Sequence, residues 1–366
     1  MPTIRVHLAG DTGADRSYDI LIGRGLVDEI GVAVARHGGH RAVVISDAAV
    51  AGLAANVTAA LNAADVHTTT IVVPSGEASK SLAEAGRLWE TLAEQAVDRH
   101  THLVAVGGGV VGDLAGFIAA TFARGLPVWQ VPTTLVAQVD SAIGGKTGIN
   151  LAAGKNLVGC FWQPCGVFAD IDTLATLPDR EFTSGLAEVV KYGMILDAEF
   201  FAWLERHAAA LVARDPLPLV EAVERSAALK ARVVAEDERE QTGLRAVLNY
   251  GHTFAHAFET AAGYGTLLHG EAVSIGMVCA ARLAERLGRI GSDVVARQDA
   301  LLTACQLPRA IPPPNSSTDH LLAIMARDKK SLAGRLRFIL PDRIGHVELV
   351  ADIDPALVAS ILRSCR

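Results

Sequence analysis

Three histidines and a glutamate in the second half of the chain have the types and spacing of a metal site. His252 and His256 in NYGHTFAHAFE are four residues apart, so both point from one face of a helix, as does Asn249. His269 in LLHGEAV opens the next predicted helix, and Glu188 lies in the helical run GLAEVVKYG. One carboxylate and two imidazoles would leave coordination positions open for substrate or water, as in a catalytic Zn²⁺ site. The residues alone do not decide which two histidines bind.

A lysine accompanies the glutamate. Lys191 follows Glu188 by three residues, so the two share a helix face, and their apolar neighbours favour an inward position for both. The alternative is a solvated ion pair at the surface, which would stabilise the fold by less than ~1 kcal/mol. An inward pair would instead belong to the candidate site.

A glycine-rich turn in the first half could bind a pyrophosphate. Residues 107–112, GGGVVG, follow the apolar run LVAV and precede the helical run DLAGFIAATFA. Glycines permit close approach of the backbone, and the amides of a helix N-terminus favour an anion. The dinucleotide fingerprint is incomplete, because no acidic residue follows at ~20 positions to bind the ribose. A tight packing turn explains this motif equally well.

Other polar loops follow predicted strands, at the edge where open α/β sheets bind ligands. The loop SGEASK, residues 75–80, follows TTIVVP, and Thr133 and Thr134 follow VWQVP. Glu77 suits ribose hydroxyls, and the two threonines suit phosphate or amide groups. Asp47 closes the strand AVVIS and is a further ribose or adenine candidate, although a helix N-cap is at least as good an explanation.

Basic side chains supply candidate anion contacts in a chain that is acidic as a whole. Lys146 in SAIGGKTGIN and Lys155 in AAGKNLVG lie in predicted glycine-rich loops with few acidic neighbours. Lys230, Arg245 and the pair Lys329-Lys330 add further cations. Any one of them could be a solvated surface charge. Their occurrence together with the metal and glycine motifs favours an anionic substrate.

The elements that must position these residues divide the chain in two. Short β-rich runs alternate with helical patterns in residues 1–178, which predicts an α/β domain with a largely parallel sheet. Its strands are predicted at 41–46, 68–73, 103–106 and 128–131. Residues 179–366 have helical periodicity and predict a mainly α-helical domain with a small hairpin near its end. Its longest helices are predicted at 217–235, 248–262, 271–287 and 294–304, and the hairpin pairs 336–340 with 346–350.

Size and composition exclude several classes of protein. The 366 residues exceed the usual size of a single core, so two domains with a cleft between them are expected. A formal net charge of -7 argues against a nucleic-acid partner. Charges interrupt every apolar stretch before the ~18 residues of a membrane span, and the N-terminus does not resemble a signal peptide, so we expect a cytoplasmic protein. The 5 cysteines lack paired spacing, which argues against a disulfide framework or a thiolate metal site.

Several motifs, in order and over nearly the whole chain, resemble those of 3-dehydroquinate synthases. They are GEASKS, GGGVVGDLAGFIAATFARG, VPTTLVAQVDSAIGGKTGIN, GKNLVG, GLAEVVKYG, KARVVAEDE, GLRAVLNYGHTFAHAFE, LHGEAVSIGM and RDKKSLAGRLRF. The resemblance implies an NAD-binding α/β domain and a helical metal- and substrate-binding domain, with the active site between them, usually in a homodimer. One departure is Trp162 in FWQP, where the family would have histidine or tyrosine.

The resemblance also implies a reaction. The cofactors would be NAD⁺ and a divalent metal, Zn²⁺ or Co²⁺, and the substrate 3-deoxy-D-arabino-heptulosonate 7-phosphate, a phosphorylated sugar acid. The C5 hydroxyl would be transiently oxidised, phosphate eliminated, the hydride returned, and the opened enol closed onto the C2 ketone to give 3-dehydroquinate. The implied activity is that of a carbon-oxygen lyase in the shikimate pathway of aromatic amino acid biosynthesis.

Matching motifs imply roles for individual residues. The metal would bind Glu188, His252 and His269, which leaves His256 for the substrate phosphate. Besides Asp47 from the strand pattern, NAD⁺ contacts would fall on Ser75, Gly76, Glu77, Ala78, Ser79, Lys80, Gly109, Val110, Val111, Gly112, Asp113, Thr133, Thr134, Lys146, Lys155, Thr173, Leu174, Ala175 and Thr176. Substrate and catalytic contacts would fall on Asp140, Lys146, Asn156, Lys191, Lys230, Arg245, Asn249, His256, Lys330 or its neighbour Lys329, and Arg124 of the neighbouring subunit.

Within that set, Asp140 and Lys191 would handle the proton of the C5 hydroxyl. Lys230, Arg245 and Asn249 would surround the substrate carboxylate and the adjacent C2 hydroxyl. This group of cations predicts a preference for the sugar acid over neutral sugar phosphates.

Three other functions compete with this interpretation. A related cyclase could use sedoheptulose 7-phosphate or glucose 6-phosphate with the same cofactors. A metal-dependent alcohol or glycerol dehydrogenase would share the fold. A catalytically silent nucleotide-binding protein belongs to another class, but it gives no reason for metal ligands, phosphate lysines and nucleotide loops to occur together.

Overall fold

The structure, a computed structural model, describes most of the chain, namely residues 1–8, 15–263, 265–311, 317–327 and 336–365. It divides into two compact units. Unit 1 comprises Met1–Leu177 and Lys230–Arg239, and unit 2 comprises Pro178–Leu229 and Glu240–Arg366. The predicted boundary after residue 178 lies one residue from the division. Residues 179–366 are nevertheless not all in unit 2, because Lys230–Arg239 make their contacts mainly within unit 1.

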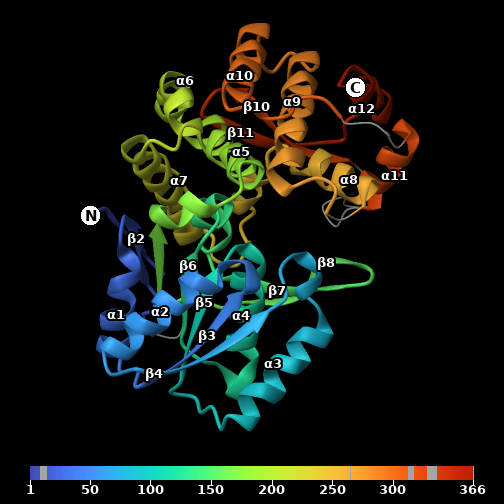
Figure 1. Ribbon diagram of the computed structural model, residues 1–366. Helices are drawn as coiled ribbons and strands as arrows, with labels where there is room; N and C mark the ends of the chain where they lie inside the picture. Colours follow the sequence, from blue (N-terminus) through green and yellow to red (C-terminus); the bar gives the residue numbers. More distant parts are fainter. Residues whose placement is uncertain (9–14, 264, 312–316, 328–335, 366) are drawn as a thin grey trace. The chain divides into compact units, whose positions relative to one another are not determined.

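Unit 1 is built on a seven-stranded sheet in the order β1-β2-β9-β6-β5-β3-β4 (Figure 1). Strand β1 is antiparallel to β2, and the other neighbours are parallel. The strands are β1 (Thr3–Val6), β2 (Tyr18–Gly23), β3 (Arg41–Asp47), β4 (His67–Val73), β5 (His102–Gly107), β6 (Val128–Pro132) and β9 (Gly166–Asp170). The predicted α/β class with a largely parallel sheet is therefore confirmed.

Helices cover both faces of this sheet. Val43 and Ile45 of β3 pack into a core with α3 and α4, whereas Ala42 and Val44 pack into a second core with α1 and α2. This alternation follows from the two-residue repeat of a strand, and burial of both faces explains why the strands read as continuous apolar runs. The helices are α1 (Ile30–Arg36), α2 (Ala51–Ala63), α3 (Leu82–Glu94) and α4 (Gly109–Thr121).

The order of the parallel strands reverses between β3 and β5. Strand β4 follows β3 on one side, whereas β5, β6 and β9 succeed one another on the other side. Such a reversal leaves a crevice at the carboxyl ends of the strands, where open α/β sheets bind ligands. Short helical turns follow the strands at this edge: η1 (Leu26–Glu29), η2 (Ala48–Val50), η3 (Glu77–Ser79), η5 (Ala137–Ser141) and η6 (Ile171–Thr176). A further turn, η4 (Phe122–Arg124), joins α4 to the start of β6.

The sequence predicted loops for the glycine-rich segments around Lys146 and Lys155. They are instead strands of one antiparallel hairpin. Its strands are β7 (Lys146–Leu151) and β8 (Gly154–Phe161). A Cβ atom added at Gly148 or Gly159 would lie 2.7 or 2.1 Å from a carbonyl oxygen of the opposite strand. These glycines therefore serve close pairing of the two strands.

Unit 2 is mainly helical, as predicted. Its elements are α5 (Asp179–Leu196), α6 (Ala198–Val212), α7 (Pro216–Glu236, whose last residues belong to unit 1), η7 (Leu244–Asn249), α8 (His252–Ala262), α9 (His269–Arg286), α10 (Ser292–Ala304), α11 (Thr318–Arg327), α12 (Pro355–Ser364) and a hairpin of β10 (Arg337–Arg343) and β11 (His346–Ala351). The hairpin is confirmed. The predicted helix 248–262 begins only at His252, because Gly251 has a left-handed φ of 78° and separates α8 from η7. None of the helices in the described ranges combines the length and apolar character that a bilayer crossing requires.

Candidate active site

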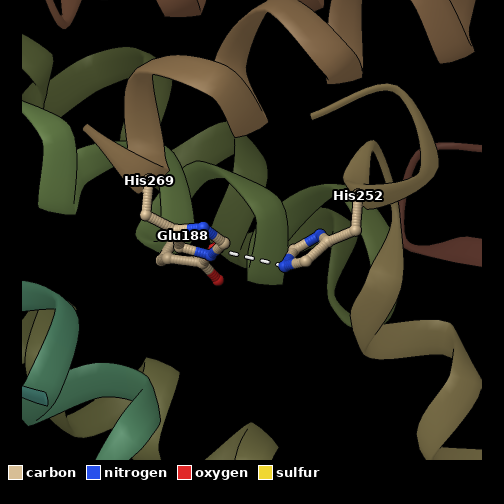
Figure 2. A group of neighbouring side chains, drawn as sticks. All are labelled: Glu188, His252 and His269. Carbon is tan, nitrogen blue, oxygen red and sulfur yellow. Dashed lines mark ion pairs between the residues drawn. The ribbon is translucent and has the colours of Figure 1, made fainter. Parts of the chain in front are cut away.

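Glu188, His252 and His269 come together in unit 2 from three helices (Figure 2). Glu188 lies on α5, and the two histidines are the first residues of α8 and α9. Their candidate ligand atoms all lie within 4.8 Å of one another, and Glu188 is fully buried. The residues alone left the choice of histidines open, and the structure brings together the two that the family resemblance implied.

Close glycine contacts allow the three helices to converge. A Cβ atom at Gly270 would lie 1.8 Å from the carbonyl oxygen of Ser184, so only glycine lets α9 begin against α5 at this point. Ser184 precedes Glu188 by about one helical turn, and the contact therefore sets the first residue of α9 beside that carboxylate. Helices α8 and α9 also meet closely, because a Cβ atom at Gly276 would lie 2.2 Å from the carbonyl oxygen of Gly251.

The distances within the group fit ligands of a metal ion. The Nε2 atoms of His252 and His269 lie 3.8 and 3.5 Å from Oε1 of Glu188, beyond good hydrogen-bonding distance. Two ligands bound to a tetrahedral Zn²⁺ at ~2.1 Å are themselves ~3.4 Å apart. One carboxylate and two imidazoles are also the donor types that Zn²⁺ accepts. The group therefore fits a divalent metal with a coordination position left for another ligand.

Outer partners hold the opposite ring nitrogens. Nδ1 of His252 lies 3.0 Å from the carbonyl oxygen of Tyr250 and must donate to it, which turns Nε2 toward Glu188. Nδ1 of His269 lies 3.7 Å from Glu259. Desolvation lowers the pKa of His269, but the carboxylates of Glu188 and Glu259 outweigh it and raise the pKa to about 10. Sequence analysis missed Glu259, although it follows His252 by seven residues and so shares its helix face.

Lys191 belongs to the same group. Its Nζ forms an ion pair with Oε2 of Glu188, and both residues are buried, at 1% and 0% exposure. The alternative of a solvated surface pair is therefore wrong. His256 lies one turn further along α8, with its ring perpendicular to that of His252 and 5.7 Å away between centroids. Unit 2 thus gathers five of the residues that the family motifs pointed to.

Two other predicted residues of unit 2 have local partners. Arg245 in η7 is 1% exposed, and its Nε lies 3.9 Å from Oε1 of Glu240. The spacing of Asn249 predicted that it shares a helix face with His252 and His256, but it lies in η7 and not in α8. Its side-chain amide donates to the carbonyl of Ala246 at 3.3 Å. Lys329 and Lys330 lie outside the described residues.

The predicted NAD loops follow the carboxyl ends of parallel strands in unit 1. Asp47 ends β3, 75–80 follow β4, 107–113 join β5 to α4, Thr133 and Thr134 follow β6, and 173–176 lie in η6 after β9. The α4 N-cap, Gly108, provides no side-chain cap, so the first amides of α4 can meet an anion. The glycines also pack closely, because a Cβ atom at Gly109 would lie 2.7 Å from Oγ of Ser141. The interpretation as a tight packing turn is therefore confirmed, and the pyrophosphate site stays a prediction.

A partly buried network links these loops to the β7–β8 hairpin. Nζ of Lys80 donates to Asp113 at 2.7 Å and to Oδ1 of Asn156 at 2.5 Å, and Lys80 is only 4% exposed. Burial raises the pKa of Asp113, and the neighbouring Lys80 opposes that rise. Asn150, which sequence analysis missed, donates to Glu77 at 2.8 Å. Lys80 is therefore a cross-link between loops as well as a candidate ligand contact.

Asp47 has the capping role that was the alternative to a ligand contact. Its carboxylate accepts a hydrogen bond of 2.7 Å from the backbone N–H of Ala49, at the start of η2. The hydroxyl of Ser75 donates to the same oxygen. The carboxylate thereby joins the turns that follow β3 and β4.

The cations predicted for the substrate differ in their surroundings. Nζ of Lys230 lies 2.7 Å from Oδ1 of Asp140, and both residues belong to unit 1. Arg124 is exposed at a turn where Ala123 and Arg124 both have left-handed φ angles, 49° and 68°. Trp162, the departure from the family pattern, supports this turn: its ring contacts the backbone at Gly125, and its Nε1 donates to a carbonyl oxygen at 2.9 Å.

Two family models match consecutive parts of the chain, 3-dehydroquinate synthase N-terminal over residues 70–184 and 3-dehydroquinate synthase C-terminal over residues 185–331. The 3-dehydroquinate synthase of Rhodopirellula baltica is 50% identical, with 96% of each chain covered. The chain belongs to the 3-dehydroquinate synthase family. The 3-dehydroquinate synthase of Methylococcus capsulatus is 48% identical, with 99% of each chain covered.

Solved structures of other sugar-phosphate cyclases are also similar. A 2-deoxy-scyllo-inosose synthase complexed with carbaglucose-6-phosphate, NAD⁺ and Co²⁺ aligns over 100% of both chains with a TM-score of 0.89 and 27% identity. A 2-epi-5-epi-valiolone synthase from Streptomyces hygroscopicus, with NAD⁺ and Zn²⁺ bound, covers 95% of this chain and 96% of its own, with a TM-score of 0.87 and 29% identity. A glycerol dehydrogenase from Schizosaccharomyces pombe, 18% identical with a TM-score of 0.68, shares the fold alone.

Proposed function

We propose that this protein converts 3-deoxy-D-arabino-heptulosonate 7-phosphate to 3-dehydroquinate and phosphate, with NAD⁺ and a divalent metal as cofactors. The observation that carries the proposal is the convergence of Glu188, His252 and His269 in a chain that belongs to the 3-dehydroquinate synthase family. Enzymes with 46–50% identity over nearly the full length carry this name. The cyclases with solved structures are less similar, at 27–29% identity.

The proposal assigns a site in the chain to each cofactor. Glu188, His252 and His269 would hold the metal, and the first amides of α4 with the loops after β3, β4, β6 and β9 would hold NAD⁺. When bound, the metal supplies a Lewis acid and NAD⁺ supplies a hydride acceptor that is regenerated in each cycle. The solved cyclases with NAD⁺ and Co²⁺ or Zn²⁺ support this assignment by similarity.

Two residue pairs would control protons. Lys191 shares the buried carboxylate of Glu188, which places an ammonium group beside the metal ligands. Asp140 pairs with Lys230, whose Nζ donates hydrogen bonds to both the side chain and the carbonyl oxygen of Asp140. A carboxylate held by a fixed cation stays ionised and can accept a proton from a substrate hydroxyl. We assign the role of general base to Asp140. We assign to Lys191 the role of a cation beside the metal ligands.

Charge would select the substrate. Arg245 is buried, and a guanidinium can bind a carboxylate through two parallel N–H bonds. We propose that it recognises the carboxylate of the sugar acid, together with Asn249 and Lys230, and that His256, Lys146, Asn156 and one of Lys329 and Lys330 serve the rest of the substrate. We further propose a homodimer in which Arg124 reaches the phosphate site of the neighbouring subunit. The cytoplasmic location stays an expectation.

One assay tests this function against its rivals. The purified protein is loaded with Zn²⁺ or Co²⁺ and NAD⁺ and is given the heptulosonate phosphate, and phosphate and NADH are followed together. We expect phosphate release without net accumulation of NADH. Stoichiometric NADH would indicate a dehydrogenase, turnover of sedoheptulose 7-phosphate or glucose 6-phosphate alone would indicate another cyclase, and no reaction with any of them would overturn the proposal.

A further inference from the structure

Strands β6 and β9 are neighbours in the sheet, but they stop pairing before their carboxyl ends. Within the described residues their ladder extends only to the pair of Gln130 and Val167. Pro132, which ends β6, has no N–H to continue it. The last residues of the two strands, Pro132 and Asp170, are both buried, so their carbonyl oxygens need a donor from elsewhere.

The side chain of Gln138 supplies that donor. Gln138 lies in η5 and is fully buried. Its Nε2 lies 3.1 Å from the carbonyl oxygen of Pro132 and 2.8 Å from that of Asp170. Carbonyl oxygens only accept, so these contacts fix which end of the amide is the NH₂ group. The two N–H bonds of one amide thus replace the missing rungs between β6 and β9.

The strands that Gln138 joins carry two of the loops assigned to NAD⁺. Thr133 and Thr134 directly follow β6, and Thr173 in η6 follows β9. Nε2 of Gln138 also lies 3.2 Å from Oγ1 of Thr173, and that hydroxyl donates to the carbonyl of Asp170 at 2.7 Å. The amide therefore touches both turns, and a shift of its side chain would change the separation between them.

The turn after β9 is itself tied to the rest of unit 1. The carboxylate of Asp170 accepts hydrogen bonds from the backbone N–H groups of Leu26 at 2.7 Å and Asp172 at 3.0 Å. On the other side, the hydroxyl of Thr134 accepts from the N–H of Ala137 at 3.2 Å, at the start of η5. Gln138 is the link between these two supported turns.

We propose that Gln138 is a positioning residue for NAD⁺ binding. It holds the turns after β6 and β9 at the separation that the cofactor requires, without contact to the reacting atoms. The proposal rests on the proposed function, because NAD⁺ is the ligand that the two turns would bind. Residues that orient metal ligands from the layer behind them typically change metal affinity or activity by about 10- to 100-fold when they are replaced, and we expect an effect of the same order here.

A single substitution separates this role from simple core packing. Gln138→Met keeps the length of the side chain and removes both donors. Gln298→Met is the matched control: Gln298 is also fully buried, and its Nε2 donates to the carbonyl of Met277 at 3.0 Å, but it lies on α10 in unit 2. Both variants lose a buried amide and should show similar losses of melting temperature.

The measurements are the Kd for NAD⁺ by calorimetry with zinc-loaded protein, and KM and kcat in the phosphate-release assay. For Gln138→Met we expect Kd and KM for NAD⁺ to rise about 10- to 100-fold, with kcat at saturating NAD⁺ within about twofold. For Gln298→Met we expect Kd for NAD⁺ to stay within about twofold of wild type. Equal NAD⁺ affinity in the two variants would overturn the proposal.

A second variant guards against a failure to fold. Gln138→Asn keeps the amide but is one methylene shorter, so it can reach at most one of the two carbonyl oxygens. We expect a smaller rise in Kd for NAD⁺, and an unchanged Kd would count against the inference. If wild-type protein itself does not bind NAD⁺, the proposed function fails. If wild-type protein binds NAD⁺ and the Gln138 variants bind it equally well, only the role of Gln138 fails.

Discussion

Unit 1 and unit 2 handle buried charge differently. In unit 1 the lysines at the ligand edge have acids of their own: Lys80 lies 2.7 Å from Asp113, and Lys230 lies 2.7 Å from Asp140. In unit 2 one fully buried carboxylate, Glu188, faces two imidazoles and an ammonium group. These lysines of unit 1 are thus balanced in pairs, whereas the two imidazoles and the ammonium group of unit 2 share the carboxylate of Glu188, and Glu259 lies beside His269.

This contrast has a physical consequence. Turns at the edge of the unit 1 sheet are supported by hydrogen bonds, some of them to the carboxylates of Asp47 and Asp170, so the loss of one bond costs about 0.5–3 kcal/mol. A buried charge that loses its partner costs about 3–5 kcal/mol. We therefore expect substitutions of the residues that support the turns of unit 1 to weaken function by degrees, and substitutions around Glu188 to remove it.

The largest expected effect is in the metal group. His269→Ala, or removal of metal by a chelator, should lower phosphate release by at least about a thousandfold, because a Lewis acid contributes several kcal/mol to the barrier. The melting temperature should change by only a few degrees, since an open catalytic site seldom supplies most of the folding energy. Metal content is checked by elemental analysis. Full activity in metal-free protein would contradict the assignment and remove the contrast between the units.

The second prediction concerns Arg245. Arg245→Lys keeps the charge but loses the two parallel N–H bonds, so kcat/KM for the heptulosonate should fall by about a hundredfold. Wild-type protein should strongly prefer this acid over sedoheptulose 7-phosphate, because a neutral sugar offers no carboxylate to the guanidinium of Arg245. Steady-state kinetics with both substrates measure this. Similar kcat/KM values for the two would favour a different cyclase.

The third prediction sharpens the role of unit 1 in a homodimer. Arg124→Ala and Lys146→Ala proteins should each be inactive, but a mixed dimer contains one site with neither change. An equal mixture with random exchange should regain about a quarter of wild-type activity. Mixed dimers are isolated with two different affinity tags. Purified mixed dimers without activity would place Arg124 outside the neighbouring site.

The smallest expected effect lies at the opposite end of the unit 1 sheet. His102 accepts a hydrogen bond of 2.8 Å from Nε1 of Trp129, and burial, with a smaller contribution from His37, lowers the pKa of His102 to about 4. An unfolded histidine has a pKa near ~6.5, so the unfolded chain binds the proton first as the pH falls. Stability from this group is complete above about pH 6.5 and is lost progressively down to about pH 4.

The test compares wild type with His102→Gln, which can still accept from Trp129 but does not titrate. Between pH 7 and pH 5.5 the free energy of unfolding of wild type should fall by about 1 kcal/mol more than that of the variant. Urea denaturation at each pH measures the difference. Parallel pH curves for the two proteins would show that His102 titrates normally, and the NAD⁺ affinity should be the same in both.

Much of the fold could be predicted from local pattern. The strands of unit 1 are buried on both faces, so they appear in the sequence as short apolar runs such as VAVG. In the helices of unit 2, apolar residues recur with the helical period. The glycine-rich segments around Lys146 and Lys155 were predicted wrongly. Glycine permits a loop and also permits two strands to approach closely, and only the packing of Gly148 against β8 distinguishes these outcomes.

The sequence by itself determined which residue types could act and which loops could meet an anion, because residue spacing fixes helix faces and strand ends. Only the tertiary structure decided that His252 and His269 lie with Glu188, since these residues are far apart in the chain and meet through the glycine contacts of α5, α8 and α9. It also showed Gln138 as the bridge between β6 and β9. A buried hydrogen bond between strand ends depends on how those strands diverge, and no local pattern carries that information.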